Sequence, residues 1–276
     1  MTFGDFTTIR PSLDGGVLTV VLDNPPVNVL GATMMREVRD LLTDVRDNSS
    51  VKVIVFESAD PEFFLAHVDM RIADDMEILT EVAESAPPGV NVFQSIGELI
   101  RHQPQVTIVK LRGVARGGGA EFVAAADMSF AADTARIGQI EALMGITPGG
   151  GATQYLRERV GRNRALEIVL TGEALDAATA AAYGWINRVV LEDRLDEEVA
   201  HIASSIASLA EGVAAAAKQA LPPAEYGEAL VTENDAWSSL VIRPAAGQLM
   251  SAALDAGAQT PEGERQLEKL MRSVRL

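Results

Sequence analysis

The sequence predicts an α/β fold, because apolar segments of strand length alternate with amphipathic segments of helical period through its first half. Residues 17–22, which read Val-Leu-Thr-Val-Val-Leu, form a near-continuous apolar run that ends at the turn-forming sequence Asp-Asn-Pro-Pro. Residues 34–45 place apolar side chains at every third or fourth position, which makes one apolar helical face: Met34, Val38, Leu41, Leu42 and Val45. This alternation favours strands that are connected by right-handed crossovers.

The same alternation continues along the first half of the chain. We expect a second strand at residues 51–56, where five of six side chains are apolar, and a second helix at residues 92–100. A third strand is expected at residues 106–111, which again form a short apolar run. The order strand, helix, strand, helix, strand is the pattern of a βαβ fold.

The second half of the sequence is mainly helical from about Arg164 onward. Residues 213–221 are rich in alanine, which has the highest helix propensity. The pair Tyr183-Gly184 marks a helix end, because glycine suits the left-handed conformation of the cap. We therefore expect an α/β core over residues 1–190 and a helical C-terminal region over residues 191–276, packed on the core or on a neighbouring subunit.

Composition and charge exclude several classes of site and partner. The 276 residues include no cysteine, so disulfides, thiolate nucleophiles and cysteine-based metal sites are impossible. The three histidines are scattered along the sequence and form no metal-binding motif, so we predict no metal. A net charge of -16 argues against nucleic acid and anionic membranes as partners. No apolar run of transmembrane length and no signal peptide is present, so we expect a cytoplasmic protein.

The most informative segment is Gly113-Val-Ala-Arg-Gly-Gly-Gly-Ala-Glu-Phe122, which follows a strand and opens a helix of small residues. Its three consecutive glycines leave backbone N–H groups uncovered at a helix start, where the helix dipole favours negative charge. The segment lacks the Gly-Lys-Ser/Thr ending of a Walker A loop and the last glycine of a Rossmann fingerprint. It is a candidate oxyanion site, although a glycine turn for close helix–strand packing explains the spacing equally well.

Two glutamates are candidate catalytic groups. Glu121 stands at the mouth of an apolar helix, which favours a position in a cavity over one in bulk water. Glu141 lies in a mostly apolar stretch before a glycine-rich turn, and the alternative for it is a surface carboxylate at the end of a strand. Together they would form a two-carboxylate site for acid–base catalysis, but the sequence spacing does not place them face to face.

The segments described above resemble the signatures of the enoyl-CoA hydratase/isomerase (crotonase) superfamily. The glycine run resembles the segment that supplies one oxyanion-hole N–H, which by that match is the N–H of Gly118. Residues 64–70, Phe-Leu-Ala-His-Val-Asp-Met, resemble the other oxyanion segment, whose matching N–H is that of Val68. Glu121 and Glu141 stand where hydratases of this family carry their two catalytic glutamates.

Three further segments carry the resemblance: residues 24–30 resemble a CoA-contacting loop, residues 148–154 the turn after the second glutamate, and residues 171–190 the stretch before the terminal helices. The resemblance implies the following substrate-binding residues: Val27, Ala66, His67, Gly117, Pro148 and Gly149. It also implies a crotonase-like spiral of ββα units with a helical C-terminal region, assembled as a homotrimer or a dimer of trimers. The implied substrate is an acyl-CoA, and no cofactor is expected beyond the coenzyme A within it.

The resemblance favours an enoyl-CoA hydratase that adds water across a 2-enoyl-CoA double bond through a stabilised enolate. The alternatives are isomerisation, decarboxylation or thioester hydrolysis on the same platform, and a non-catalytic acyl-CoA-binding protein. An α/β-hydrolase is excluded because its Gly-x-Ser-x-Gly elbow is missing.

Two residues depart from the family pattern. His67 replaces the usual glycine, and either shapes its loop through hydrogen bonds or alters the pocket. Arg116 replaces an apolar residue, and is either a contact to a CoA phosphate or a solvated or paired arginine.

Overall fold

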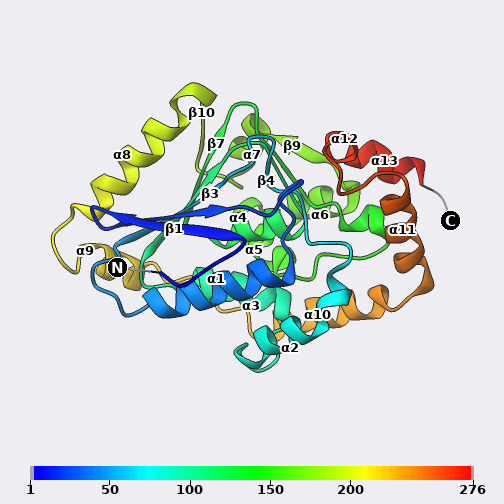
Figure 1. Ribbon diagram of the computed structural model, residues 1–276, viewed down its shortest axis with the longest axis horizontal. Coiled ribbons are helices and arrows are strands. Elements are labelled where there is room, and N and C mark those ends of the chain that lie inside the picture. The colour runs from blue at the N-terminus through cyan, green and yellow to red at the C-terminus, as the bar shows by residue number, and fades with distance from the viewer. Residues whose placement is uncertain (1–2, 275–276) are drawn as a thin grey trace.

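The computed structural model describes residues 3–274, and its strands form two sheets (Figure 1). The six-stranded sheet has the order β1 (Ile9–Asp14), β2 (Val17–Leu22), β3 (Val53–Ser58), β5 (Val106–Leu111), β7 (Met128–Ala132) and β10 (Arg188–Val190). The four-stranded sheet has the order β4 (Phe63–Leu65), β6 (Val114–Arg116), β8 (Arg136–Gly138) and β9 (Ala174–Asp176). The pairs β1–β2 and β8–β9 are antiparallel, and the other neighbours are parallel.

A helix follows each of the first four pairs of strands in the chain. The α-helices are α1 (Ala32–Val45), α2 (Met76–Glu84), α3 (Val92–Arg101), α4 (Gly118–Ala125), α5 (Ala152–Val160), α6 (Arg162–Thr171), α7 (Ala177–Tyr183), α8 (Leu195–Ala207), α9 (Val213–Ala220), α10 (Glu228–Val241), α11 (Pro244–Asp255), α12 (Pro261–Glu264) and α13 (Leu267–Ser273). Three short 3-10 helices, η1 (Ile72–Asp75), η2 (Glu141–Met144) and η3 (Glu192–Arg194), complete the set. Among residues 3–274, no helix is long and apolar enough to cross a membrane.

The chain order builds the predicted spiral of ββα units. In three successive units, one strand joins the six-stranded sheet, the next joins the four-stranded sheet, and a helix follows: β3, β4 and α2–α3, then β5, β6 and α4, then β7, β8 and α5. The α/β prediction is therefore confirmed, and so are the expected strands and helices of the first half. The boundaries differ slightly, since β3 begins at Val53 rather than at residue 51.

The unpredicted elements are mostly very short. The strands of the second sheet have three residues each, which is too short for a periodic pattern to appear in the sequence. β9 and β10 also interrupt the second half, which is therefore less uniformly helical than the sequence indicated. The predicted helix end at Tyr183 is confirmed, because Gly184 takes the left-handed conformation with φ 86°.

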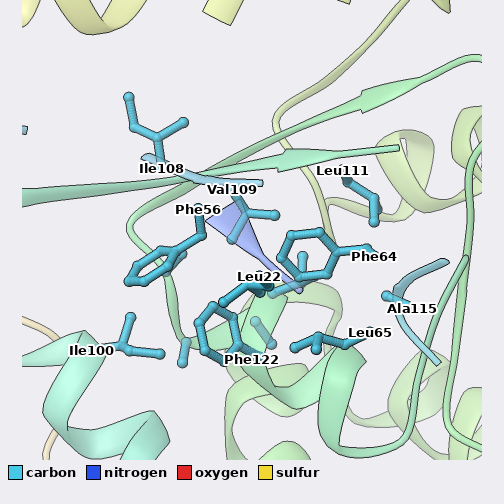
Figure 2. Packing of buried hydrophobic residues seen from close by; sticks show 14 of the residues in the cluster. Leu22, Phe56, Phe64, Leu65, Ile100, Ile108, Val109, Leu111, Ala115 and Phe122 are labelled. Atoms are coloured by element: carbon cyan, nitrogen blue, oxygen red, sulfur yellow. The ribbon is translucent and has the colours of Figure 1, made fainter. Parts of the chain in front are cut away.

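The main core lies between the six-stranded sheet and the helices that follow it. Phe56 on β3 meets Phe122 on α4 edge to face, with ring centroids 4.9 Å apart, and Phe64 adds a third ring (Figure 2). This packing fixes α4, whose first residues belong to the glycine run, against the sheet. In Figure 1, α8 lies on one side of the sheet and α1 and α3 on the other, while α10 to α13 gather at one end of the molecule.

Candidate active site

The two predicted oxyanion segments lie side by side. Gly118 is the first residue of α4, so its N–H has no carbonyl within the helix to bond. Val68 forms a β-bridge with Leu30: the N–H of Leu30 donates to the carbonyl of His67 at 2.8 Å. Because carbonyl and N–H point in opposite directions across a trans peptide, the N–H of Val68 points away from Leu30. Among the described residues, nothing accepts a hydrogen bond from it.

Glycine is required at position 118 because the two segments approach so closely. A Cβ atom there would stand 2.4 Å from a methyl carbon of Val68, which is closer than real Cβ contacts come. Val68 and Gly118 therefore both line the same cavity, as the predicted oxyanion hole needs.

Glu121 enters this cavity from the first turn of α4, and only 6% of its surface is exposed. One carboxylate oxygen, Oε1, accepts hydrogen bonds from the N–H of Gly150 at 2.8 Å and of Ala152 at 3.2 Å. A Cβ atom at residue 150 would stand 2.2 Å from the other oxygen, so a larger residue there would displace the Glu121 carboxylate. The glycine-rich turn after Glu141 therefore donates hydrogen bonds to Glu121 rather than to Glu141.

Glu141 is the first residue of η2 and lines the same cavity, with 8% of its surface exposed. The fully buried Gln139, with its amide oriented to satisfy both polar atoms, places its nitrogen 3.0 Å from each carboxylate oxygen of Glu141. The structure therefore brings the two predicted glutamates together, and the alternative of a surface carboxylate is wrong for both.

Burial and mutual repulsion shift the titration of the pair. Burial raises the pKa of Glu141 to about 7, helped by the negative charge of Glu233 and opposed by the positive charge of His67. Burial also raises the pKa of Glu121 well above its usual value, and the charges of Glu141 and Glu233 add to the rise. Because the two groups interact, they titrate as a pair, and the pair retains a proton near neutral pH.

The sequence analysis missed Glu233, which reaches the site from α10. Its carboxylate accepts hydrogen bonds from the N–H of Gly151 at 2.6 Å, the N–H of Thr153 at 2.9 Å and the side-chain amide of Gln94 at 3.1 Å. The hydroxyl of Thr153 donates to it as well. Burial raises the pKa of Glu233, and the hydrogen bonds oppose that rise. All four contacts are donors, so the ionised carboxylate satisfies them best. Glu233 is thus a third buried carboxylate, which holds the start of α5 in place.

The cavity has a volume of about 510 Å³, within the range of small-molecule sites. Apart from the glutamates, its lining is mainly apolar and includes side chains from α2, α3, η2, α10 and α11, for example Leu79, Phe93, Met144, Trp237 and Met250. The lining also includes three of the predicted substrate-binding residues: His67, Gly117 and Gly149.

The other three predicted substrate-binding residues do not line this cavity. Val27 and Ala66 are fully buried in a small apolar cluster with Val29 and Phe63, behind the oxyanion segment. Pro148 directly precedes the lining residue Gly149. Their predicted contacts with substrate stay predictions.

The two departures from the family pattern are buried and paired. The ring nitrogens of His67 lie 2.7 Å from the carbonyl oxygen of Val68 and 3.0 Å from a carboxylate oxygen of Glu264. Arg116 is 3% exposed and binds Glu268 through Nε at 2.7 Å and Nη2 at 3.1 Å. Arg116 is therefore a paired arginine, and the alternative of a CoA-phosphate contact has no support in its buried position.

The family comparison agrees with this geometry. The family model described as enoyl-CoA hydratase/isomerase matches residues 12–244, which is most of the chain. The chain belongs to the enoyl-CoA hydratase/isomerase family. The match covers both oxyanion segments, both predicted glutamates and Glu233, but it ends before Glu264.

Two relatives of this enoyl-CoA hydratase/isomerase family member carry the name of a specific reaction. The crotonyl-CoA hydratase of Syntrophomonas wolfei is 32% identical over 193 residues, which is 69% of this chain and 72% of the relative. The carnitinyl-CoA dehydratase of Proteus mirabilis is 32% identical over 205 residues, or 74% and 76% of the two chains. The crystal structure of a candidate enoyl-CoA hydratase from Streptomyces avermitilis is 66% identical, covers 98% of each chain and has a TM-score of 0.96.

Proposed function

We propose that the protein is an enoyl-CoA hydratase, which adds water across the Cα–Cβ double bond of a 2-enoyl-CoA thioester. The observation that carries the proposal is the placement of two buried glutamates, Glu121 and Glu141, on the cavity that Val68 and Gly118 also line. A hydratase needs an acid, a base and a site for negative charge within reach of one substrate, and these are the groups present.

In this mechanism the thioester carbonyl oxygen accepts hydrogen bonds from the N–H groups of Val68 and Gly118. Water adds to Cβ, and the electrons of the double bond move toward the carbonyl oxygen, where the two donors stabilise the enolate. Each such donor is typically worth about 2.7–4 kcal/mol of barrier. One glutamate of the pair takes a proton from water, while Glu141 gives a proton to Cα, so the pair needs one proton between its two groups.

The raised pKa values support a pair that shares one proton. A pair of ordinary carboxyl groups would both be ionised at neutral pH and would have no proton to give. Burial and repulsion between Glu121, Glu141 and Glu233 keep a proton on the pair at neutral pH. The proposed reaction uses no metal and no redox cofactor, and coenzyme A takes part only as a portion of the substrate.

The proposal includes the assembly and the location of the enzyme. We expect a homotrimer or a dimer of trimers in the cytoplasm, acting in fatty acid metabolism. Large exposed apolar side chains support self-association, since Leu170, Leu221 and Ile242 are each 68% exposed or more. Sedimentation at micromolar concentration tests the assembly, and a monomer would contradict it.

The decisive experiment follows loss of the enoyl absorbance of crotonyl-CoA. Wild-type protein is expected to hydrate it, and Glu141→Gln is expected to bind it with kcat lowered about 10²–10⁴-fold. Glu228→Gln, an exposed change on α10, is the matched control and should keep wild-type activity. Parallel assays for released CoA thiol and for a shifted double bond identify hydrolysis or isomerisation. Either product, or acyl-CoA binding without any product, would replace the hydratase assignment.

A further inference from the structure

The loop at residues 67–70, which carries the Val68 N–H, is hydrogen-bonded to residues 259–264 near the C-terminus. Gln259 accepts a hydrogen bond from the N–H of Met70 at 2.8 Å and donates to Asp69 at 3.0 Å. Glu264, on α12, holds the ring of His67 at 3.0 Å. Three successive contacts therefore connect residues 67–70 to residues 259–264, almost two hundred positions later in the chain.

The hydrogen-bond geometry fixes the charge state of His67. Its Nδ1 faces a carbonyl oxygen, that of Val68, and its Nε2 faces the carboxylate of Glu264, so both nitrogens act as donors. The bonded oxygen of Glu264 also accepts from the N–H of Gln259 at 2.8 Å, and its other oxygen lies 3.6 Å from Arg116. Those contacts keep Glu264 ionised, and His67 is then an imidazolium.

The pKa values agree with this geometry. Burial alone lowers the pKa of His67, but the charge and hydrogen bond of Glu264 and the carbonyl of Val68 raise it above its ordinary value, against the charge of Arg116. Burial raises the pKa of Glu264, while His67, the N–H of Gln259 and Arg116 lower it below its ordinary value. The two partners therefore stabilise each other's charge.

The position of this ion pair gives it an effect on the active site. His67 lines the cavity, and a Cβ atom added to Gly117 would lie 3.8 Å from His67 and 3.0 Å from Glu141, so the three residues are neighbours. The carbonyl of His67 is bonded to Leu30 and the carbonyl of Val68 to the His67 ring. The peptides on both sides of Val68 are thus held, and the direction of its N–H is fixed.

We propose that His67 and Glu264 are positioning residues of the oxyanion hole: the buried ion pair fixes the Val68 N–H from behind and places a positive charge beside Glu141. The proposal rests on the proposed function for its catalytic readout. It predicts that the pair acts on the barrier of the reaction and on the titration of Glu141, beyond holding the C-terminal segment in place.

The test compares His67→Ala, Glu264→Gln, the double variant and wild type with crotonyl-CoA. Misplacing a catalytic donor by about 1 Å can cost about 100-fold, so each single variant is expected to lose about 10- to 100-fold in kcat with little change in KM. Because the two residues act as a unit, the double variant should lose little more than either single one. Arg265→Ala is the matched control. Arg265 directly follows Glu264 and forms an exposed ion pair with Glu62, so its removal should keep kcat.

The pH profile separates positioning from simple stabilisation. The positive charge of His67 lowers the pKa of Glu141 and with it the pH at which the glutamate pair loses its first proton. Loss of that charge should therefore move the acidic limb of kcat/KM to higher pH in both single variants, while Arg265→Ala leaves the limb in place. The groups that face His67 are Glu264, Arg116 and Glu141, and none of them is altered in the control. Lower melting temperatures with an unchanged kcat and unchanged limb would overturn the proposal.

A spectroscopic readout does not depend on the reaction. NMR of protein with ¹⁵N-labelled histidine reports the protonation of each imidazole ring. The signals of His67 are those that are missing in His67→Ala, and in wild type they should show an imidazolium above pH 7. Glu264→Gln should convert them to a neutral ring. A neutral His67 ring in wild type at pH 6 would overturn the proposal, whereas an imidazolium in a protein that hydrates no enoyl-CoA would overturn only the proposed function.

Discussion

Replacing Glu233 by glutamine tests whether a third carboxylate sets the working pH of the catalytic pair. Glu233 and Glu121 accept hydrogen bonds from consecutive amides, those of Gly151 at 2.6 Å and Gly150 at 2.8 Å. The backbone nitrogens of neighbouring residues lie about 3.8 Å apart or less, so the two carboxylate oxygens that accept from these amides are separated by at most about 9 Å. At this separation and an effective dielectric constant of about 20, the repulsion between two unit charges is about 1.8 kcal/mol, which raises a pKa by about 1.3 units.

The sign of the effect follows from the charge that is removed. Glu233 raises the pKa values of Glu121 and Glu141, so Glu233→Gln should lower both. The pair can take a proton from water only after it has lost the first of its two protons, so the acidic limb of kcat/KM reports the first ionisation of the pair. That limb is expected near pH 7 in wild type, where the pKa of Glu141 lies, and should move down by about one unit. The assay is hydration of crotonyl-CoA between pH 5.5 and 9.5, after circular dichroism has verified folding.

The control for this change is Glu228→Gln, which removes an exposed charge from the same helix and should leave the limb in place. Glutamine cannot accept all four hydrogen bonds of Glu233, so a loss of stability of about 1–3 kcal/mol is expected alongside the shift. An acidic limb that stays fixed or moves upward would refute the electrostatic reasoning, whatever happens to stability.

Three further predictions concern the same cavity. Glu121→Gln and Glu141→Gln should each lower kcat about 10²–10⁴-fold, and steady-state kinetics of the double variant should show far less than the product of the two losses. Gly150→Ala should abolish most hydration, because its Cβ would stand 2.2 Å from Glu121, whereas Gly247→Ala meets nothing within 4 Å and should keep full activity. The melting temperature of the latter should rise slightly, since alanine is favoured over glycine within a helix. Lengthening the acyl chain beyond four carbons should raise kcat/KM about fourfold per methylene until the apolar cavity is full, because burial of each methylene is worth about 0.8 kcal/mol. A kcat/KM that does not change with chain length would show that the cavity does not bind the acyl chain.

The sequence was sufficient for the fold where its pattern is local. Strands such as β2 and β5 and the helix α1 have apolar patterns of the right length and period, and the structure has them within two residues of the predicted bounds. β1 escaped prediction because Pro11 interrupts its alternation, which is tolerated at the edge of a sheet. Strands of three residues carry no period at all.

The active site was predictable only where its residues stand in compact motifs. Glu121 and Gly118 share one glycine-rich segment, and Glu141 precedes another. Glu233 lies on an ordinary amphipathic helix with no motif around it, and nothing local indicates that it binds the turn beside Glu121. The partner of Arg116, Glu268, is 152 residues away, so the sequence could not decide between a paired arginine and a phosphate contact. Long-range pairing of buried charges is a property of the folded chain.

The contact between residues 67–70 and residues 259–264 has a consequence for biosynthesis. A ribosome releases the chain from its N-terminus, so Glu121, Glu141 and both oxyanion donors emerge long before the segment that clasps the Val68 loop. The cavity of such a nascent chain also lacks Trp237 and Met250, and with them part of one wall. Full activity should therefore appear only when the last helices are translated and docked. The last helices could also serve as the smaller fragment of a split reporter, in which activity appears only when that fragment binds the rest of the chain.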